Sequence, residues 1–207
     1  MELRSPASSR MLMQVLAHRP VQDIVRLLQE YHHPTYAHSV RVALVATDIG
    51  EESQVNYYDR RVLCTGGLLH DIGKTRVPLA ILDSPVALTE GQYRIMELHP
   101  RYGADIVGEM SEGSVRDIVV GHHERKASPY PRSGDDRREE DRQGLARRAV
   151  RPQFQRLIDI VAAADVCDAL LEKRAYKPSL SIDDAARVAR DQFIGDPSLV
   201  DAVLSRY

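Results

Sequence analysis

Apolar residues recur at helical spacing over most of this chain. One predicted helix collects positions i, i+4, i+7 and i+11 on a single face: His38, Val42, Val45 and Ile49. A second predicted helix, over residues 154–171, keeps the same period and carries Asp165 on its apolar stripe. No alternating segment is long enough for a convincing strand, and no internal repeat occurs. The pattern therefore predicts an all-α fold.

Capping residues mark several further helices. Thr89 and Ser181 stand where an N-cap is expected, and Pro20 suits a first helical turn. Residues 78–84 are expected to be a short link between helices. The remaining predicted helices cover residues 12–16, 21–31, 59–72, 89–98, 101–110, 115–123, 182–193 and 197–204.

The length of 207 residues fits one domain with a short addition. We expect residues 1–30 to form an N-terminal helical extension and residues 31–207 to form the domain itself. Residues 132–151 carry a dense mixture of charges, which is typical of a solvated loop.

Composition narrows the classes of function. The hydrophobic fraction of 43% supports a real core, and a net charge of −2 gives no global basic surface for a nucleic acid polymer. No window reaches the ~20 apolar residues that cross a membrane, and residues 1–13 lack the apolar stretch of a signal peptide. Cys64 and Cys167 lie within apolar helical patterns and are expected as core residues rather than a disulfide. A cytoplasmic protein is the expectation.

The predicted helices carry polar residues where aliphatic ones are expected. Five histidines and two aspartates lie on these inner faces or at a helix junction: His38, His70, Asp71, His99, His122, His123 and Asp165. An unpaired buried polar group costs on the order of 1–3 kcal/mol, and the whole stability of a domain is about 5–15 kcal/mol. Shared divalent cations remove this cost, because neutral imidazoles and carboxylates are their ligands. His32 and His33 lack apolar partners in register and are expected in a loop or at the surface.

Each of these signals is weak alone. A single inward histidine is more often a hydrogen-bonded core residue, and adjacent His-Asp or His-His pairs arise by chance. The combined set favours a metal site over hydrogen-bonded core residues. Seven candidate ligands exceed what one ion needs. We therefore predict two divalent ions bridged by a carboxylate, with Asp71 as the natural bridge because candidate ligands flank it on both sides. Such pairs of ions activate water and neutralise a phosphodiester.

In their order along the chain, these residues lie in motifs that resemble the HD-domain phosphohydrolase superfamily, and specifically its HD-GYP branch. The matching segments, between about residues 34 and 205, are His-Ser-Val-Arg-Val at 38–42, Leu-His-Asp-Ile-Gly-Lys at 69–74, Leu-Thr at 88–89, His99-Pro100 with Gly103, His-His-Glu-Arg at 122–125, Ala-Asp-Val-Cys-Asp-Ala-Leu at 164–170, Arg-Ala-Tyr-Lys at 174–177 and Gly-Asp-Pro at 195–197. The ordered set is specific, whereas His-Asp alone is a weak motif. The resemblance implies the HD-domain helical bundle. It also implies hydrolysis of cyclic di-GMP to pGpG or GMP with two or three metal ions, often iron or manganese.

The same resemblance implies roles for individual residues. It gives the seven histidines and aspartates as the metal ligands, Asp71 and Lys74 as the catalytic residues, and Lys74 as a contact to the scissile phosphate. Arg174 and Lys177 match the pair that grips the phosphates of the dinucleotide, and Tyr130 matches a substrate contact. These residue types suit phosphate, because arginine chelates two oxygens while lysine supplies a point charge. A solvated basic turn is the plainer interpretation of the segment that holds Arg174 and Lys177.

Two positions depart from the pattern of the family. Its three-metal members carry a glutamate one helical turn before the first histidine, where this chain has Pro34, so two ions are expected. The Gly-Tyr-Pro segment becomes Pro129-Tyr130-Pro131, and proline fixes φ near about −65° where glycine is free. The loop at 126–151 is therefore the least transferable part, and it is also the candidate contact for a signalling partner.

Three functions are compatible with these residues. The leading hypothesis is a metal-dependent phosphodiesterase that acts on cyclic di-GMP in bacterial signalling. The second keeps this chemistry but takes another cyclic dinucleotide or a nucleotide phosphoester. The third is a metal-bound sensor or interaction module with weak turnover. Its motivation is Pro129, which alters the loop that carries the Gly-Tyr-Pro segment in the family. The oligomeric state, including a homodimer, stays open.

Overall fold

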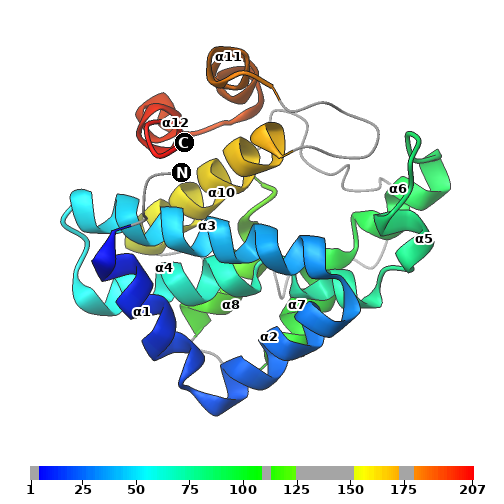
Figure 1. Ribbon diagram of the computed structural model, residues 1–207, viewed down its shortest axis with the longest axis horizontal. Coiled ribbons are helices and arrows are strands. Elements are labelled where there is room, and N and C mark those ends of the chain that lie inside the picture. Colours follow the sequence, from blue (N-terminus) through cyan, green and yellow to red (C-terminus); the bar gives the residue numbers. More distant parts are fainter. Residues whose placement is uncertain (1–4, 109–112, 125–151, 173–179) are drawn as a thin grey trace.

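The computed structural model describes residues 5–108, 113–124, 152–172 and 180–207 (Figure 1). Its helices are α1 (Pro6–Leu16), α2 (Arg19–Tyr31), α3 (His33–Glu52), α4 (Tyr57–Leu69), α5 (Leu79–Leu82), α6 (Glu90–Met96), α7 (His99–Val107), α8 (Gly113–Gly121), α10 (Pro152–Leu171), α11 (Ile182–Gln192) and α12 (Pro197–Leu204). A short 3-10 helix, η1 (Ile72–Arg76), follows α4. Since these residues hold no β-strand, the all-α prediction is confirmed for the described part of the chain.

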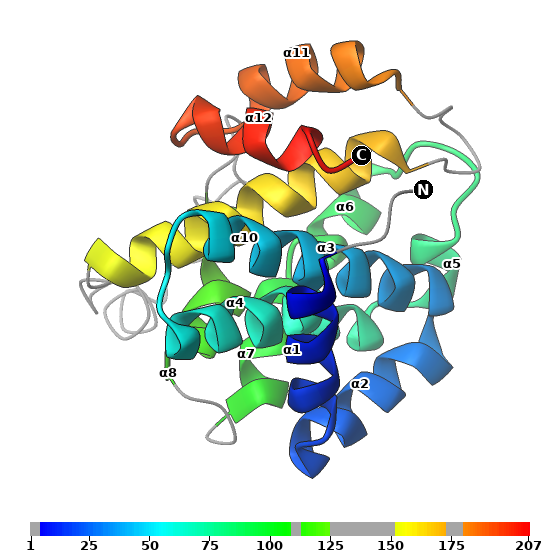
Figure 2. The same cartoon turned by 60° about the vertical axis from the view of Figure 1, so that its left-hand side comes forward.

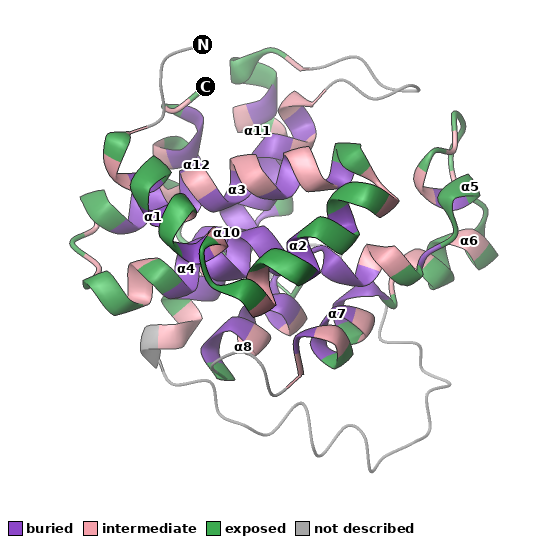
Figure 3. Ribbon diagram, turned by 60° about the horizontal axis from the view of Figure 1, so that its bottom comes forward, coloured by how far each residue is buried: buried purple, intermediate pink, exposed green. Residues whose placement is uncertain are grey.

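Three helices form the centre of the bundle. α3 packs against α4 and α10, and α8 packs on both α4 and α10. α7 lies between α8 and η1, while α1 and α2 cover α3 (Figures 1 and 2). α11 and α12 cover α10 (Figure 2). The buried residues gather along α3, α4 and α10, which form the interior of the molecule (Figure 3). Within the described ranges, none of the helices combines the length and hydropathy needed to cross a bilayer.

The two N-terminal helices contribute to the common core. Their buried residues belong to the same hydrophobic cluster as those of α3 and α4: Met11, Val15, Ile24, Val25 and Leu28. Burying each of these side chains contributes about 1.5–3 kcal/mol relative to exposure. The division of the chain at residue 30 stays a prediction.

Two glycines allow neighbouring backbones to approach closely. A Cβ atom on Gly67 of α4 would lie 2.8 Å from the Cα of Ala43 in α3. A Cβ atom on Gly73 of η1 would lie 1.9 Å from the carbonyl oxygen of His99, at the start of α7. Close-packed interiors leave no room for such contacts, so both positions require glycine.

The helix expected over residues 59–72 is too long. α4 ends at Leu69, His70 and Asp71 form a turn, and η1 follows. A hydrogen bond from the Lys74 N–H to the Asp71 carbonyl, 2.9 Å long, replaces the α-helical pattern there. Tertiary packing overrides the helical period, because Gly73 lies against the backbone of α7.

The other corrections concern helix ends. α1 begins at Pro6 rather than residue 12, because the Ser5 side chain accepts a hydrogen bond from the Ser8 N–H at 3.1 Å and caps the helix. The expected link at 78–84 contains the single turn of α5. The helix expected over 101–110 runs from His99 to Val107, where Gly108 takes a φ of 47° and ends it. The helix expected over 115–123 ends at Gly121, which leaves His122 and His123 in the turn that follows.

His32 and His33 stand at the start of α3. His33 is exposed, as the sequence predicts. His32 precedes the helix, but its side chain is half-buried and accepts a hydrogen bond from the Thr35 N–H at 3.2 Å. Its Nε2 lies 3.0 Å from a carboxylate oxygen of Asp83. His32 therefore serves as the N-cap of α3.

Both cysteines are expected to resist thiol reagents in the native protein. Cys64 and Cys167 are fully buried and free, and burial raises the pKa of each thiol to about 12. The thiolate is the reactive form, so a chromogenic disulfide reagent near pH 8 should react about 100-fold more slowly with native than with denatured protein. Denaturation should release two reactive thiols. Rapid reaction of either thiol before unfolding would contradict the packing described above.

Candidate metal centre

Helices and turns from five parts of the chain deliver polar side chains to one buried place. The contributors are α3 with His38, the turn after α4 with His70 and Asp71, the start of α7 with His99, the turn after α8 with His122 and His123, and α10 with Asp165. All seven residues are buried, and none is more than 7% exposed. The structure therefore brings together all seven candidate metal ligands that the sequence suggests.

The seven side chains divide into two groups around one carboxylate. The donor atoms within each group lie within 4.8 Å of one another, and the groups are Asp71 with His99, His122 and His123, and His38 with His70 and Asp165. Asp71 Oδ1 is 3.2 Å from His99 Nε2. Asp71 Oδ2 is 3.4 Å from His70 Nε2 and 3.9 Å from His38 Nε2. The Asp71 carboxylate thus faces both groups, as a bridging ligand does.

Backbone hydrogen bonds fix which ring nitrogen carries the proton. Three rings place Nδ1 at 2.8, 2.7 and 2.9 Å from the carbonyl oxygen three residues earlier, in the pairs His70 with Gly67, His99 with Met96, and His122 with Val119. Only a protonated nitrogen donates to a carbonyl, so each neutral ring presents a lone pair at Nε2. The Nε2 atoms of His99 and His122 face each other at 3.3 Å. Two lone pairs at this distance repel, and a shared cation removes the repulsion.

The pKa shifts of His122, His99 and Asp71 suit metal binding. His38 differs, because burial lowers its pKa but Asp165 and Asp168 raise it to about 9. Burial lowers the pKa of His122 well below its usual value, and the neighbouring His70 and His99 rings act in the same direction. Burial also lowers the pKa of His99, although Asp71 opposes this shift. Burial alone would raise the pKa of Asp71, but Lys74 and then His70 hold it well below its usual range. Neutral imidazoles and an ionised carboxylate are the forms that bind metal.

Some buried atoms of the centre that could bind a metal make no hydrogen bond within the described residues. Nε2 of His70 and Oδ1 of Asp71 are among them. An atom of this kind costs about 1–3 kcal/mol when it stays unsatisfied. The nearest polar neighbours of both atoms include other candidate ligands. The residues present therefore fit divalent cations.

An arginine pairs with both carboxylates of a third cluster beside the centre. His38, Asp168 and Glu172 also lie within 4.8 Å of one another. Arg41 Nη2, however, lies 2.9 Å from Asp168 Oδ2 and 2.6 Å from Glu172 Oε1. The guanidinium therefore supplies a positive charge to both carboxylates. Sequence reasoning assigned no role to Asp168 or Arg41, although they stand three residues after Asp165 and His38 on their helices.

Lys74 reaches the centre from η1. Its Nζ lies 2.5 Å from Asp71 Oδ2, and its side chain is 19% exposed. It therefore connects the buried carboxylate with the surface. The other expected substrate contacts lie outside the described residues: Tyr130, Arg174, Lys177 and the loop at 126–151.

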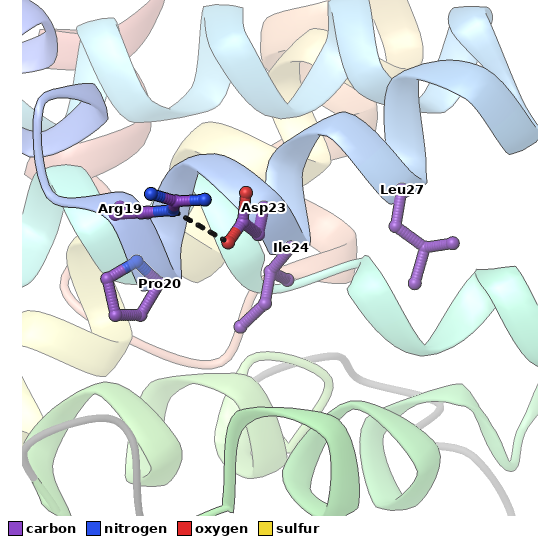
Figure 4. Close-up of a pocket in the computed structure, with 5 residues that line it drawn as sticks. All are labelled: Arg19, Pro20, Asp23, Ile24 and Leu27. Carbon is purple, nitrogen blue, oxygen red and sulfur yellow. Dashed lines mark ion pairs between the residues drawn. The ribbon is translucent and has the colours of Figure 1, made fainter.

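A separate hollow lies along α2. It has a volume of about 470 Å³ and is lined by Arg19, Pro20, Asp23, Ile24 and Leu27 (Figure 4). Its charged residues pair with each other at 4.0 Å, and the rest of the lining is apolar. None of the seven clustered residues lines this hollow, so it is separate from the buried centre.

Removal of divalent metal is expected to lower the melting temperature by about 5–10 °C. An ion present at 100 times its dissociation constant stabilises the folded state by about 2.7 kcal/mol, and each kcal/mol shifts the melting temperature of a chain of this size by about 2–4 °C. Differential scanning calorimetry with and without a chelator measures the shift. Manganese should restore the melting temperature and magnesium should not, because magnesium prefers oxygen ligands. An unchanged melting temperature after complete chelation would contradict a metal role for the centre.

Comparison with known proteins agrees with this geometry. A protein-family model described as "HD domain" matches residues 35–170. The chain is 32% identical over 190 residues to the cyclic di-GMP phosphodiesterase response regulator RpfG of Xanthomonas campestris, covering 87% of this chain and 46% of RpfG. It is 32% identical over 172 residues to a cyclic di-GMP phosphodiesterase of Thermotoga maritima, covering 81% and 43%. It is 30% identical over 161 residues to the 3'3'-cGAMP-specific phosphodiesterase 3 of Vibrio cholerae, covering 76% and 31%. The chain spans less than half the length of these relatives.

A solved structure shares the fold. The HD domain of the L. monocytogenes phosphodiesterase PgpH, in complex with cyclic-di-AMP, superposes with a TM-score of 0.60 at 16% identity, covering 88% of this chain and 95% of that one. At this identity the likeness concerns the fold alone. The family match, in contrast, spans all seven clustered residues, from His38 to Asp165. The chain therefore belongs to the HD-domain family.

Proposed function

We propose that this chain is a metal-dependent phosphodiesterase that hydrolyses cyclic di-GMP, to pGpG or GMP, in bacterial second-messenger signalling. The observation that carries the proposal is the convergence of five imidazoles and two carboxylates in one buried centre around Asp71. The relatives in Xanthomonas campestris and Thermotoga maritima support the substrate by their names. The ordered motifs support a place in the HD-GYP branch, and a cytoplasmic setting would give access to this messenger.

The centre is proposed to hold two divalent ions, iron or manganese. The division of the donor atoms into two groups supports two ions, and the two oxygens of Asp71 support a bridge between them. Imidazole nitrogen and carboxylate oxygen are suitable ligands for both metals. When bound, such a pair supplies an activated water and neutralises the charge of a phosphodiester.

Lys74 is proposed to join Asp71 as a catalytic residue. Its ammonium pairs with Asp71 Oδ2, and part of its side chain is exposed. A phosphate oxygen arriving from the surface would compete with Asp71 for this ammonium, and the charge that develops in the transition state would strengthen the contact. Arg174, Lys177 and Tyr130 are proposed as further contacts to the dinucleotide. A signalling partner at residues 126–151 and a homodimer stay predictions.

A second candidate function is hydrolysis of another cyclic dinucleotide. The observation that favours it is the Vibrio cholerae relative, which is named for 3'3'-cGAMP and is nearly as similar as the cyclic di-GMP enzymes. Pro129, which replaces the glycine of the recognition segment, motivates both this candidate and a metal-bound sensor with weak turnover. The metal centre is common to all three functions.

A panel of substrates separates these candidates. Protein purified without oxygen and loaded with Fe²⁺ or Mn²⁺ should be incubated with cyclic di-GMP, 3'3'-cGAMP and cyclic di-AMP, and the products resolved by chromatography. We expect cyclic di-GMP to be cleaved fastest and chelation to stop the reaction. Faster cleavage of another dinucleotide favours the second candidate, and binding without cleavage supports the sensor. A metal-loaded protein that cleaves none of the three would contradict the proposed phosphodiesterase activity.

A further inference from the structure

His38 differs from three of the other clustered histidines in the hydrogen-bond partner of its Nδ1 atom. His70, His99 and His122 use a backbone carbonyl, whereas His38 Nδ1 lies 2.7 Å from the carboxylate of Asp168. A carboxylate partner raises the basicity of a metal-ligating imidazole and fixes its orientation. Asp168 therefore makes His38 the stronger donor toward the group that also contains His70 and Asp165.

Asp168 itself is held by donors on both of its oxygens. Arg41 Nε lies 2.9 Å from Oδ1, and Arg41 Nη2 lies 2.9 Å from Oδ2. The hydroxyl of Tyr207 donates to Oδ1 at 2.5 Å. Asp168 is 2% exposed, so no solvent competes for these bonds. A charge-assisted O–H···O⁻ bond of this length is among the stronger hydrogen bonds in proteins.

The packing of α12 brings Tyr207 to this position. α12 packs against α10 and α3, and Arg206 forms an ion pair with Glu52 of α3. The Tyr207 N–H donates to the Leu204 carbonyl at 3.2 Å, so a hydrogen-bonded turn after α12 leads to the tyrosine. Figure 2 shows α12 packed across α10, the helix that carries Asp165 and Asp168. Tyr207 lies outside the family match at residues 35–170. Two hydrogen bonds, one between Tyr207 and Asp168 and one between Asp168 and His38, connect it with a candidate metal ligand.

We propose that Tyr207 is a positioning residue of the metal centre, which acts through Asp168 to set the orientation and donor strength of His38. Its effect falls on the ion held by His38, His70 and Asp165, because the other group shares no hydrogen bond with Asp168 within the described residues. The inference rests on the proposed binding of two ions. It assigns to α12 a role in metal affinity beyond covering the core.

The test compares metal binding by the wild-type chain and Tyr207→Phe, in the absence of substrate. Anaerobic titration with Co²⁺ gives two dissociation constants, and the visible absorption of bound Co²⁺ reports the strength of its ligands. We expect Tyr207→Phe to weaken one constant by about tenfold, to leave the other within about twofold, and to shift one absorption band. Asp168→Asn should weaken the same constant by about 10–100-fold. Tyr207 is 38% exposed, so loss of its hydroxyl leaves the core packed.

Tyr57→Phe is the matched control, because it removes a phenol hydroxyl that donates to Gln14 at 2.9 Å, away from the cluster. It should leave both constants and the spectrum unchanged. Unchanged binding in Tyr207→Phe would overturn the inference, as would equal weakening of both ions with a lower melting temperature, which indicates a purely structural role. These measurements need no turnover. A chain that binds two ions in this manner but cleaves no cyclic dinucleotide would refute the proposed function and leave the inference intact.

Discussion

Replacement of Asp71 by asparagine is expected to lower cyclic dinucleotide hydrolysis by about 1,000-fold or more. The amide keeps the shape of the side chain but loses the charge that lies 3.2 Å from His99 Nε2 and 3.4 Å from His70 Nε2. Its nitrogen cannot serve as a ligand, so it cannot bridge two ions. The metal content should therefore fall from about two ions per chain to about one. Steady-state kinetics and elemental analysis of the same preparation measure both effects.

Asp105→Asn is the matched control for this substitution. Asp105 is an exposed residue of α7 that pairs with Arg76 at 3.3 Å, and an exposed ion pair contributes little. We expect activity within about twofold of the wild type and an unchanged metal content. An Asp71→Asn protein that keeps two ions and normal turnover would show that another residue bridges the centre.

Gly73→Ala is expected to lower the free energy of unfolding by about 3 kcal/mol, the upper end for an overpacked interior. The new Cβ atom would lie 1.9 Å from the carbonyl oxygen of His99 and 2.5 Å from the backbone nitrogen of Gly103. Both are backbone atoms that cannot rotate away, so η1 must move from α7. That movement separates Asp71 from His99, and metal affinity should fall with stability. Urea unfolding of chelated protein, followed by metal titration, measures the two losses.

Gly91→Ala provides the contrast. Gly91 lies in α6, where an added Cβ meets nothing within 4 Å. Alanine in an exposed helix is more favourable than glycine by up to about 1 kcal/mol, so this variant should be as stable as the wild type or slightly more stable. Wild-type stability and metal content in Gly73→Ala would contradict the close contact between η1 and α7.

The sequence was sufficient to predict which residues meet, because helical periodicity ties each polar residue to an apolar face. His38 follows the register of Val42 and Val45, and Asp165 follows that of Val161, and all of them are buried. A side chain on such a face must point inward, whatever the order of packing. Seven inward polar groups then have few arrangements that leave them satisfied.

Helical periodicity could not predict that two helices end just before the candidate metal ligands that follow them. His70 and His122 lie just beyond the ends of α4 and α8, where each ring turns back to the carbonyl three residues earlier. That bond, and the backbone contact of Gly73 with α7, depend on tertiary packing rather than on local propensity. Periodicity also gives no sign of the network of Asp168 with Arg41 and Tyr207. The hydrogen bond from Arg41 to Glu172 in the same network joins residues 131 positions apart.

Electron paramagnetic resonance of the protein titrated with Mn²⁺ tests the bridged two-ion centre most directly. A carboxylate that faces both ligand groups would place two bound ions close enough for their spins to couple. At two ions per chain, we predict an exchange-coupled spectrum in the wild type and its loss in Asp71→Asn. Saturation at one ion per chain, or a spectrum of isolated Mn²⁺ at every stoichiometry, would contradict the two-ion centre on which the proposed phosphodiesterase depends.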